Sequence, residues 1–134
     1  MSPGPGAGLD PMTKTTRVLS VSVPVADQDA ALRFYTEVLG CELVFDAEIW
    51  PGARMVQVVP PGSDVALVLL PPDSPIPVAV RLGTADAEEA YARVRDSGVT
   101  LHNDAVLHLE GAPPMFAFAD PEGNELVYLQ DPPP

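Results

Sequence analysis

The sequence predicts an α+β domain built from two similar β-α-β-β-β halves. The first observation is that alternating apolar residues, typical of a strand, are twice followed by a capped helix. The second is that the pair Ala-Asp at the first cap recurs 59 residues later, at Asp86 after Asp27. The third is a proline-rich segment between the two patterns. Each half has one helix to cover one face of its strands, so we expect a curved mixed sheet with the helices outside and a concave groove inside.

In the first half, valines alternate with polar residues over 17–25 and predict a strand. Asp27 is placed to cap a helix whose apolar residues recur at helical spacing up to Leu39, and Gly40 ends it. Three further strands are predicted at 41–48, 53–59 and 65–70.

Residues 71–77 contain four prolines and predict a linker, because proline cannot continue a central strand. The order then repeats, with a strand at 78–83, a helix capped by Asp86 and closed by Gly98, and strands at 99–109, 115–119 and 125–130. The folded domain is therefore predicted at 17–130, in halves 17–70 and 78–130. Residues 1–16 are predicted to be a disordered Pro/Gly-rich leader or tag, and residues 131–134 a tail.

The charge balance restricts the partners. The 134 residues include 19 acidic and 7 basic side chains, for a net charge of −12, which disfavours binding to nucleic acid or to anionic membranes. The acidic residues predict a solvated surface that aids solubility, or attraction of a cationic ligand. No apolar run has the length of a membrane helix, and the N-terminal residues do not resemble a signal peptide. Cys41 is the only cysteine, so no internal disulfide can form. A cytoplasmic location is expected.

Three motifs carry a family resemblance: Val23-Pro-Val-Ala-Asp27, Phe34-Tyr-Thr-Glu-Val-Leu-Gly40 and Asp120-Pro-Glu-Gly-Asn124. In this order and spacing they resemble the vicinal oxygen chelate superfamily, which includes glyoxalase I, extradiol dioxygenases and bleomycin-resistance proteins. The likeness covers about residues 17–130. It implies the fold more strongly than any one function, because this fold hosts many activities.

The resemblance also implies where a metal would bind. Enzymes of the superfamily hold a divalent ion such as Zn, Fe, Mn or Ni through His or Glu on the first and last strands of both halves. The corresponding positions here are Ser20, Val68, Ala79 and Val127, which cannot hold a divalent metal. His102 and His108 lie too far apart along a regular strand to share one ion, roughly 20 Å. No metal, cofactor or catalytic residue is therefore predicted.

Strand parity gives the predicted lining of the groove. The expected ligand-binding residues are mainly small or apolar, with two hydroxyls, one cation, one anion and one aromatic residue. They are Ser20, Ser22, Val68, Ala79, Arg81, Glu125, Val127 and Trp50. Two alternatives stay open: Arg81 and Glu125 pair with each other inside a filled groove, or they are available to a ligand. Trp50 is expected at a pocket rim or in a dimer contact.

These observations predict a metal-free small-molecule-binding protein, similar to the drug-sequestering members of the superfamily. The resemblance implies a homodimer, and the ligand is expected to be cationic or aromatic. The alternative is a lyase, isomerase or dioxygenase of the superfamily with an atypical or metal-free site. Asp46 and Glu48 share strand parity and could act as a carboxylate pair, although exposed strand acids are the simpler interpretation.

Overall fold

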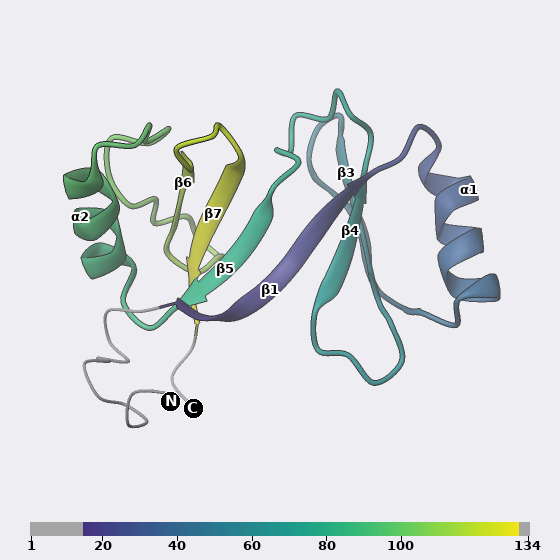
Figure 1. Ribbon diagram of the computed structural model, residues 1–134. Coiled ribbons are helices and arrows are strands. Elements are labelled where there is room, and N and C mark those ends of the chain that lie inside the picture. The colour runs from purple at the N-terminus through teal and green to yellow at the C-terminus, as the bar shows by residue number, and fades with distance from the viewer. Residues whose placement is uncertain (1–14, 132–134) are drawn as a thin grey trace. The chain divides into compact units, whose positions relative to one another are not determined.

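The structure, a computed structural model, describes residues 15–131. It divides into two compact units, an N-terminal unit of residues 19–80 and a C-terminal unit of residues 15–18 with 81–131 (Figure 1). The elements along the chain are β1 (Thr15–Pro24), α1 (Gln28–Arg33), η1 (Phe34–Val38), β2 (Glu42–Trp50), β3 (Ala53–Val59), β4 (Ala66–Leu70), β5 (Val80–Thr84), α2 (Ala87–Ser97), β6 (Met115–Ala119) and β7 (Glu125–Gln130).

The strands of the N-terminal unit follow the order β2-β3-β4-β1. β1 runs parallel to β4, whereas β3 is antiparallel to both β4 and β2, so the sheet is mixed. β2 lies at an edge, and all nine of its residues are exposed.

The helix of the N-terminal unit begins as predicted, with the Asp27 carboxylate accepting from the backbone N–H of Ala30. Its second part, η1, is a π-helix in which the N–H of Leu39 donates to the carbonyl of Phe34. The Thr36 hydroxyl donates to the Leu32 carbonyl at 2.8 Å and so occupies an acceptor that a continuing α-helix would use. The helical segment ends next to the predicted Gly40, and its last part is a π-helix, which the spacing of the apolar residues did not indicate.

The N-terminal unit is packed on both faces of its sheet. Val56 and Leu69, which pair across β3 and β4, are fully buried on the face that α1 covers. On the opposite face, a second cluster forms around Ala53, Val68 and Leu70 with Ile76 of the proline-rich segment. That segment is thus part of the packing of this unit.

In the C-terminal unit the strand order is β5-β7-β6, with β6 and β7 antiparallel. Helix α2 packs against β6 and β7 (Figure 1). Its cap is as predicted, because the Asp86 carboxylate accepts from the N–H of Glu89 and Gly98 ends the helix with a φ of 87°. Phe116 is fully buried between Tyr91, Phe118 and Tyr128.

The predicted strand at 99–109 is wrong. Only isolated bridges occur there, Leu101 with Phe118 and Leu107 with Met115. Between these bridges the Asn103 side chain accepts a hydrogen bond from the N–H of Ala117. In a regular strand pair, a backbone carbonyl would accept this hydrogen bond.

The other strands agree with the prediction to within two residues at either end. β1 begins at Thr15, inside the range predicted as a leader, and the predictions for residues 1–14 and 132–134 lie outside the described residues. The α+β class and the mixed sheet are confirmed. None of the described helices is long and apolar enough to cross a membrane.

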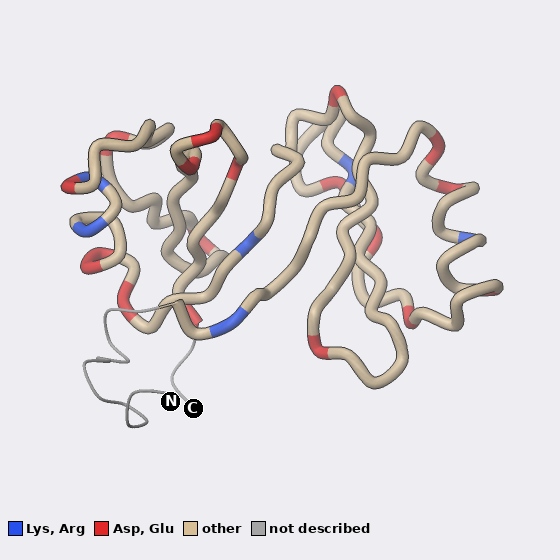
Figure 2. Tube along the Cα trace, viewed as in Figure 1, with Lys and Arg blue, Asp and Glu red and all other residues tan. Residues whose placement is uncertain are grey.

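Acidic residues occur on both helices and in several loops, and basic residues are few (Figure 2). Among the described residues, four arginines lie against aspartate or glutamate partners within their own unit: Arg17, Arg54, Arg93 and Arg95. The basic side chains therefore serve mainly in pairs with neighbouring acids.

Candidate ligand site

Two predicted site residues, Ser22 and Val68, lie in one row across the N-terminal unit. In the sheet register, Ser22 of β1 pairs with Val68 of β4, Val68 with Gln57 of β3, and Gln57 with Phe45 of β2. Directly paired residues project from the same face of a sheet, so these four side chains form one row, here called the Gln57 row. The N–H of Ser22 donates to the Ala79 carbonyl at 3.0 Å, which places Ala79 beside the Ser22 end.

The inner part of this face is closed by the chain itself. Val68 is 0% exposed, and it packs with Ile76 of the proline-rich segment. Ser20 and Ala79 are also buried. The accessible part of the face therefore lies toward β2 and β3, where Phe45 is 39% exposed and Gln57 is half-buried.

Trp50 lies at the end of β2 and is exposed. A register shift between Glu48 and Trp50 pairs it with Ala53, whose side chain belongs to the Val68 cluster. Trp50 is thus on the same face as the Gln57 row, and its place at a pocket rim or in a dimer contact stays a prediction.

The remaining predicted residues lie in the C-terminal unit. Glu125 is exposed at the start of β7 and pairs with His102, with 2.7 Å between Oε1 and Nε2. Arg81 is half-buried and has interaction partners of its own, and burial lowers its pKa. Val127 is half-buried and pairs with Ala117. Their role in ligand binding stays a prediction.

The residues at the metal positions do not fit a divalent ion. Ser20 offers one hydroxyl, and Val68, Ala79 and Val127 offer no donor atom. Across residues 15–131, no three His, Cys, Asp or Glu side chains gather where they could hold a metal. The donor set that the resemblance implies is therefore missing from the described chain.

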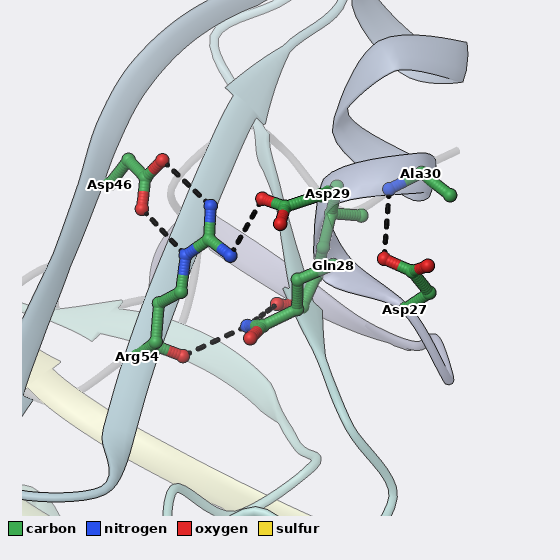
Figure 3. A network of polar contacts seen from close by, with 7 residues as sticks. Asp27, Gln28, Asp29, Ala30, Asp46 and Arg54 are labelled. Atoms are coloured by element: carbon green, nitrogen blue, oxygen red, sulfur yellow. Dashed lines mark hydrogen bonds and ion pairs between the residues drawn. The ribbon is translucent and has the colours of Figure 1, made fainter.

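A polar network lies on the helix side of the same unit (Figure 3). The Arg54 guanidinium donates to both carboxylate oxygens of Asp46, at 2.9 and 3.0 Å, and forms a 2.9 Å ion pair with Asp29 at the start of α1. The hydrogen bonds from Arg54 hold the pKa of Asp46 below its ordinary value of 3.8. Asp46 is therefore a poor proton acceptor, which argues against a catalytic pair with Glu48.

A pocket of about 230 Å³ adjoins this network. Its lining is polar and proline-rich: Gln28, Glu48, Gly52, Arg54, Pro71, Asp73, Ser74 and Pro75. The volume is below the roughly 300–1,000 Å³ of pockets that enclose a drug-sized molecule. None of the predicted site residues lines this pocket.

Sequence reasoning missed Gln57 and Phe45. Parity within 53–59 indicates that Gln57 projects away from Val56 and Val58, but parity alone does not tell which residues lie opposite it. Gln57 lies opposite Val68 because of the pairing between β3 and β4, and the sequence of one strand alone does not determine that pairing.

A model of the Glyoxalase/Bleomycin resistance protein/Dioxygenase superfamily matches residues 17–128. The chain belongs to this superfamily. Its resemblance to the vicinal oxygen chelate proteins is thereby confirmed. No curated protein matches the chain.

Solved structures share the fold of this superfamily member. Methylmalonyl-CoA epimerase from Mycobacterium tuberculosis has a TM-score of 0.72 at 23% identity, over 89% of this chain and 90% of that chain. A hypothetical protein from Bacillus halodurans has a TM-score of 0.70 at 18% identity, with coverages of 88% and 96%. A Streptomyces coelicolor methylmalonyl-CoA epimerase variant in complex with 2-nitronate-propionyl-CoA reaches 0.69 at 22% identity, with coverages of 90% and 100%. These similarities establish the fold.

Proposed function

We propose that this member of the superfamily binds a small organic molecule without a metal ion. The observation that carries the proposal is the chemistry of Ser20, Val68, Ala79 and Val127, which replaces metal ligands by a hydroxyl and three apolar side chains. An apolar surface with a few polar groups suits binding, because the apolar part supplies contact area and the polar groups fix orientation.

In the N-terminal unit the proposed ligand contacts lie on the accessible part of the face, where the register adds Gln57 and Phe45 to the residues predicted from the sequence. Ser22 and Val68 share the row with Gln57 and Phe45, and Trp50 lies on the same face. Within the C-terminal unit taken by itself, Arg81, Glu125 and Val127 stay proposed ligand contacts. The exposed aromatic rings and the net charge of −12 favour an aromatic or cationic ligand, and sequestration of a drug is the biological role we propose, in the cytoplasm.

We also propose a homodimer. All but two of the exposed large apolar side chains of the described residues lie between Phe34 and Trp50. On the helix side of the unit they include Phe34, Val38 and Leu39 of the π-helical end and Leu43 of β2. Several exposed large apolar side chains on one side of a small domain are typical of an interaction surface.

Ligand binding is tested by thermal unfolding with a panel of cationic and aromatic compounds, antibiotics included. A ligand at one hundred times its Kd adds about 2.7 kcal/mol of stability, which raises the Tm of a domain of this size by roughly 10 °C. Phe45→Ser is expected to weaken binding. Leu109→Ser, which removes an exposed apolar side chain from the C-terminal unit, is the control. If no compound raises the Tm, the proposal is wrong.

The dimer is tested separately by light scattering. Val38→Asp is expected to give a monomer, whereas Leu109→Asp, an exposed apolar residue of the C-terminal unit, leaves the mass unchanged. A monomeric wild-type protein at micromolar concentration would contradict this part of the proposal.

The alternative function is a lyase, isomerase or dioxygenase with an atypical or metal-free site. One observation favours it: the hydrogen-bonded pair of His102 and Glu125 could move a proton. Elemental analysis after dialysis helps to separate the two functions, because a stoichiometric transition metal would favour the enzyme over the metal-free binding protein. A metal-free protein that turns over a panel compound, and loses turnover in His102→Gln, would also favour the enzyme.

A further inference from the structure

Gln57 is a polar side chain that stands between two apolar members of the Gln57 row. Gln57 has Phe45 as its partner on one side and Val68 on the other. Neighbouring side chains in such a row are about 5 Å apart at Cβ. A flat molecule resting on the exposed Phe45 ring therefore has the Gln57 amide within hydrogen-bond reach.

The Gln57 amide nitrogen points to a sulfur atom. This Nε2 atom lies 3.0 Å from the Sδ of Met55, and Met55 packs against the cluster of Ala53, Val68 and Leu70. A thioether is a weak acceptor, so this contact directs the amide nitrogen without satisfying it strongly.

The amide oxygen of Gln57 has no hydrogen-bond partner among residues 15–131. Every buried side-chain nitrogen or oxygen in that range has a partner, so this half-buried oxygen is open to solvent. A carbonyl oxygen accepts hydrogen bonds, and it repels a carboxylate or phosphate placed against it.

We infer that the Gln57 amide oxygen accepts a hydrogen bond from the ligand, so that the ligand class is an aromatic molecule with an N–H or O–H donor on its ring system. This inference rests on the proposed function and specifies it. A ligand that covers this oxygen without donating to it leaves a desolvated acceptor unsatisfied, whereas a donor replaces the water that is lost. One such hydrogen bond corresponds to about a tenfold difference in Kd.

The test compares matched compounds that differ only in the donor: indole with 1-methylindole, and 2-naphthol with 2-methoxynaphthalene. Kd values are measured by calorimetry for the wild-type protein and for Gln57→Met, which keeps the length of the side chain and removes the acceptor. Gln57→Leu is a second variant, for the case in which Met repacks against Met55. Thr100→Leu, at an exposed position of the C-terminal unit, is the control.

The wild-type protein and the Thr100→Leu control are expected to prefer the donor compound of each pair by about tenfold. Both Gln57 variants are expected to reduce this preference to less than about twofold, mainly through weaker binding of the donor compound. Equal binding of the two members of each pair by the wild-type protein, or a preference that persists in both variants, overturns the inference and leaves the proposed function intact. If the four compounds and the wider panel all fail to bind, the proposed function itself is wrong.

Discussion

Removing Arg54 tests the electrostatic interpretation of the N-terminal unit most directly. Arg54→Met keeps the aliphatic stem and deletes three contacts, two to Asp46 and one to Asp29, all at 2.9–3.0 Å. Exposed ion pairs contribute about 0.2–1 kcal/mol each. Arg54 and Asp46 are only 31% and 30% exposed and bond in a bidentate arrangement, whereas Asp29 is well exposed and adds little. We expect a loss of about 1 kcal/mol at pH 7.

The loss should depend on pH in a defined direction. The pKa of Asp46 in the folded state is lowered by its hydrogen bonds to Arg54, below the ordinary value of 3.8. A carboxyl group with a lowered folded-state pKa stabilises the protein fully above its unfolded pKa, and that stability is lost as the pH falls through the folded value. The free-energy gap between wild type and Arg54→Met is therefore constant from pH 7 to about 5 and narrows below pH 4.

Urea unfolding at a series of pH values measures this gap. Arg93→Met is the matched control, because Arg93 pairs with Glu89 one helical turn away in α2, and such pairs contribute about 0.3–0.5 kcal/mol. The reasoning would be refuted if the loss of unfolding free energy in Arg54→Met were no larger than that in Arg93→Met. It would also be refuted if the loss in Arg54→Met grew as the pH fell from 5 to 3.

Three further predictions concern packing. Phe116→Ala should cost about 3–5 kcal/mol, measured by urea unfolding, because Phe116 is fully buried among aromatic rings. Gly83→Ala should lower the Tm measured by calorimetry, at a cost of about 1–3 kcal/mol, because a Cβ there would lie 2.6 Å from the Thr16 hydroxyl and closer still to the Asp131 carboxylate. Cys41 should react with a thiol reagent at the rate of unfolding, since it is buried in the folded chain.

The sequence was sufficient for the elements whose signals are local. Asp27 and Asp86 each cap a helix through their own carboxylates, and Gly98 adopts the left-handed conformation that ends α2. These features depend on residues three or four positions apart, so one sequence contains the whole signal.

Features that depend on strand pairing were harder to predict. In a regular strand every second residue projects from the same face, which would put Trp50 on the face of Asp46 and Glu48. The register shift after Glu48 moves Trp50 to the opposite face. The wrong prediction of a strand at 99–109 also came from a contact outside the segment. The Asn103 side chain accepts from the N–H of Ala117, a residue distant in sequence. Gln57 was missed because its partners, Phe45 and Val68, come from two other strands.

The burial of Val68 bears on a position that the resemblance assigns to a metal ligand. A metal ligand at this position would have to remain polar and accessible, because burying an unsatisfied polar group costs about 1–3 kcal/mol. With valine there, Ile76 of the proline-rich segment can pack onto it, and the position becomes part of the core. The same packing leaves Phe45 and Gln57 as accessible side chains of the row. The contacts of the proposed ligand in the N-terminal unit are therefore expected nearer to β2 and β3 than to the position that the resemblance assigns to the metal ligand.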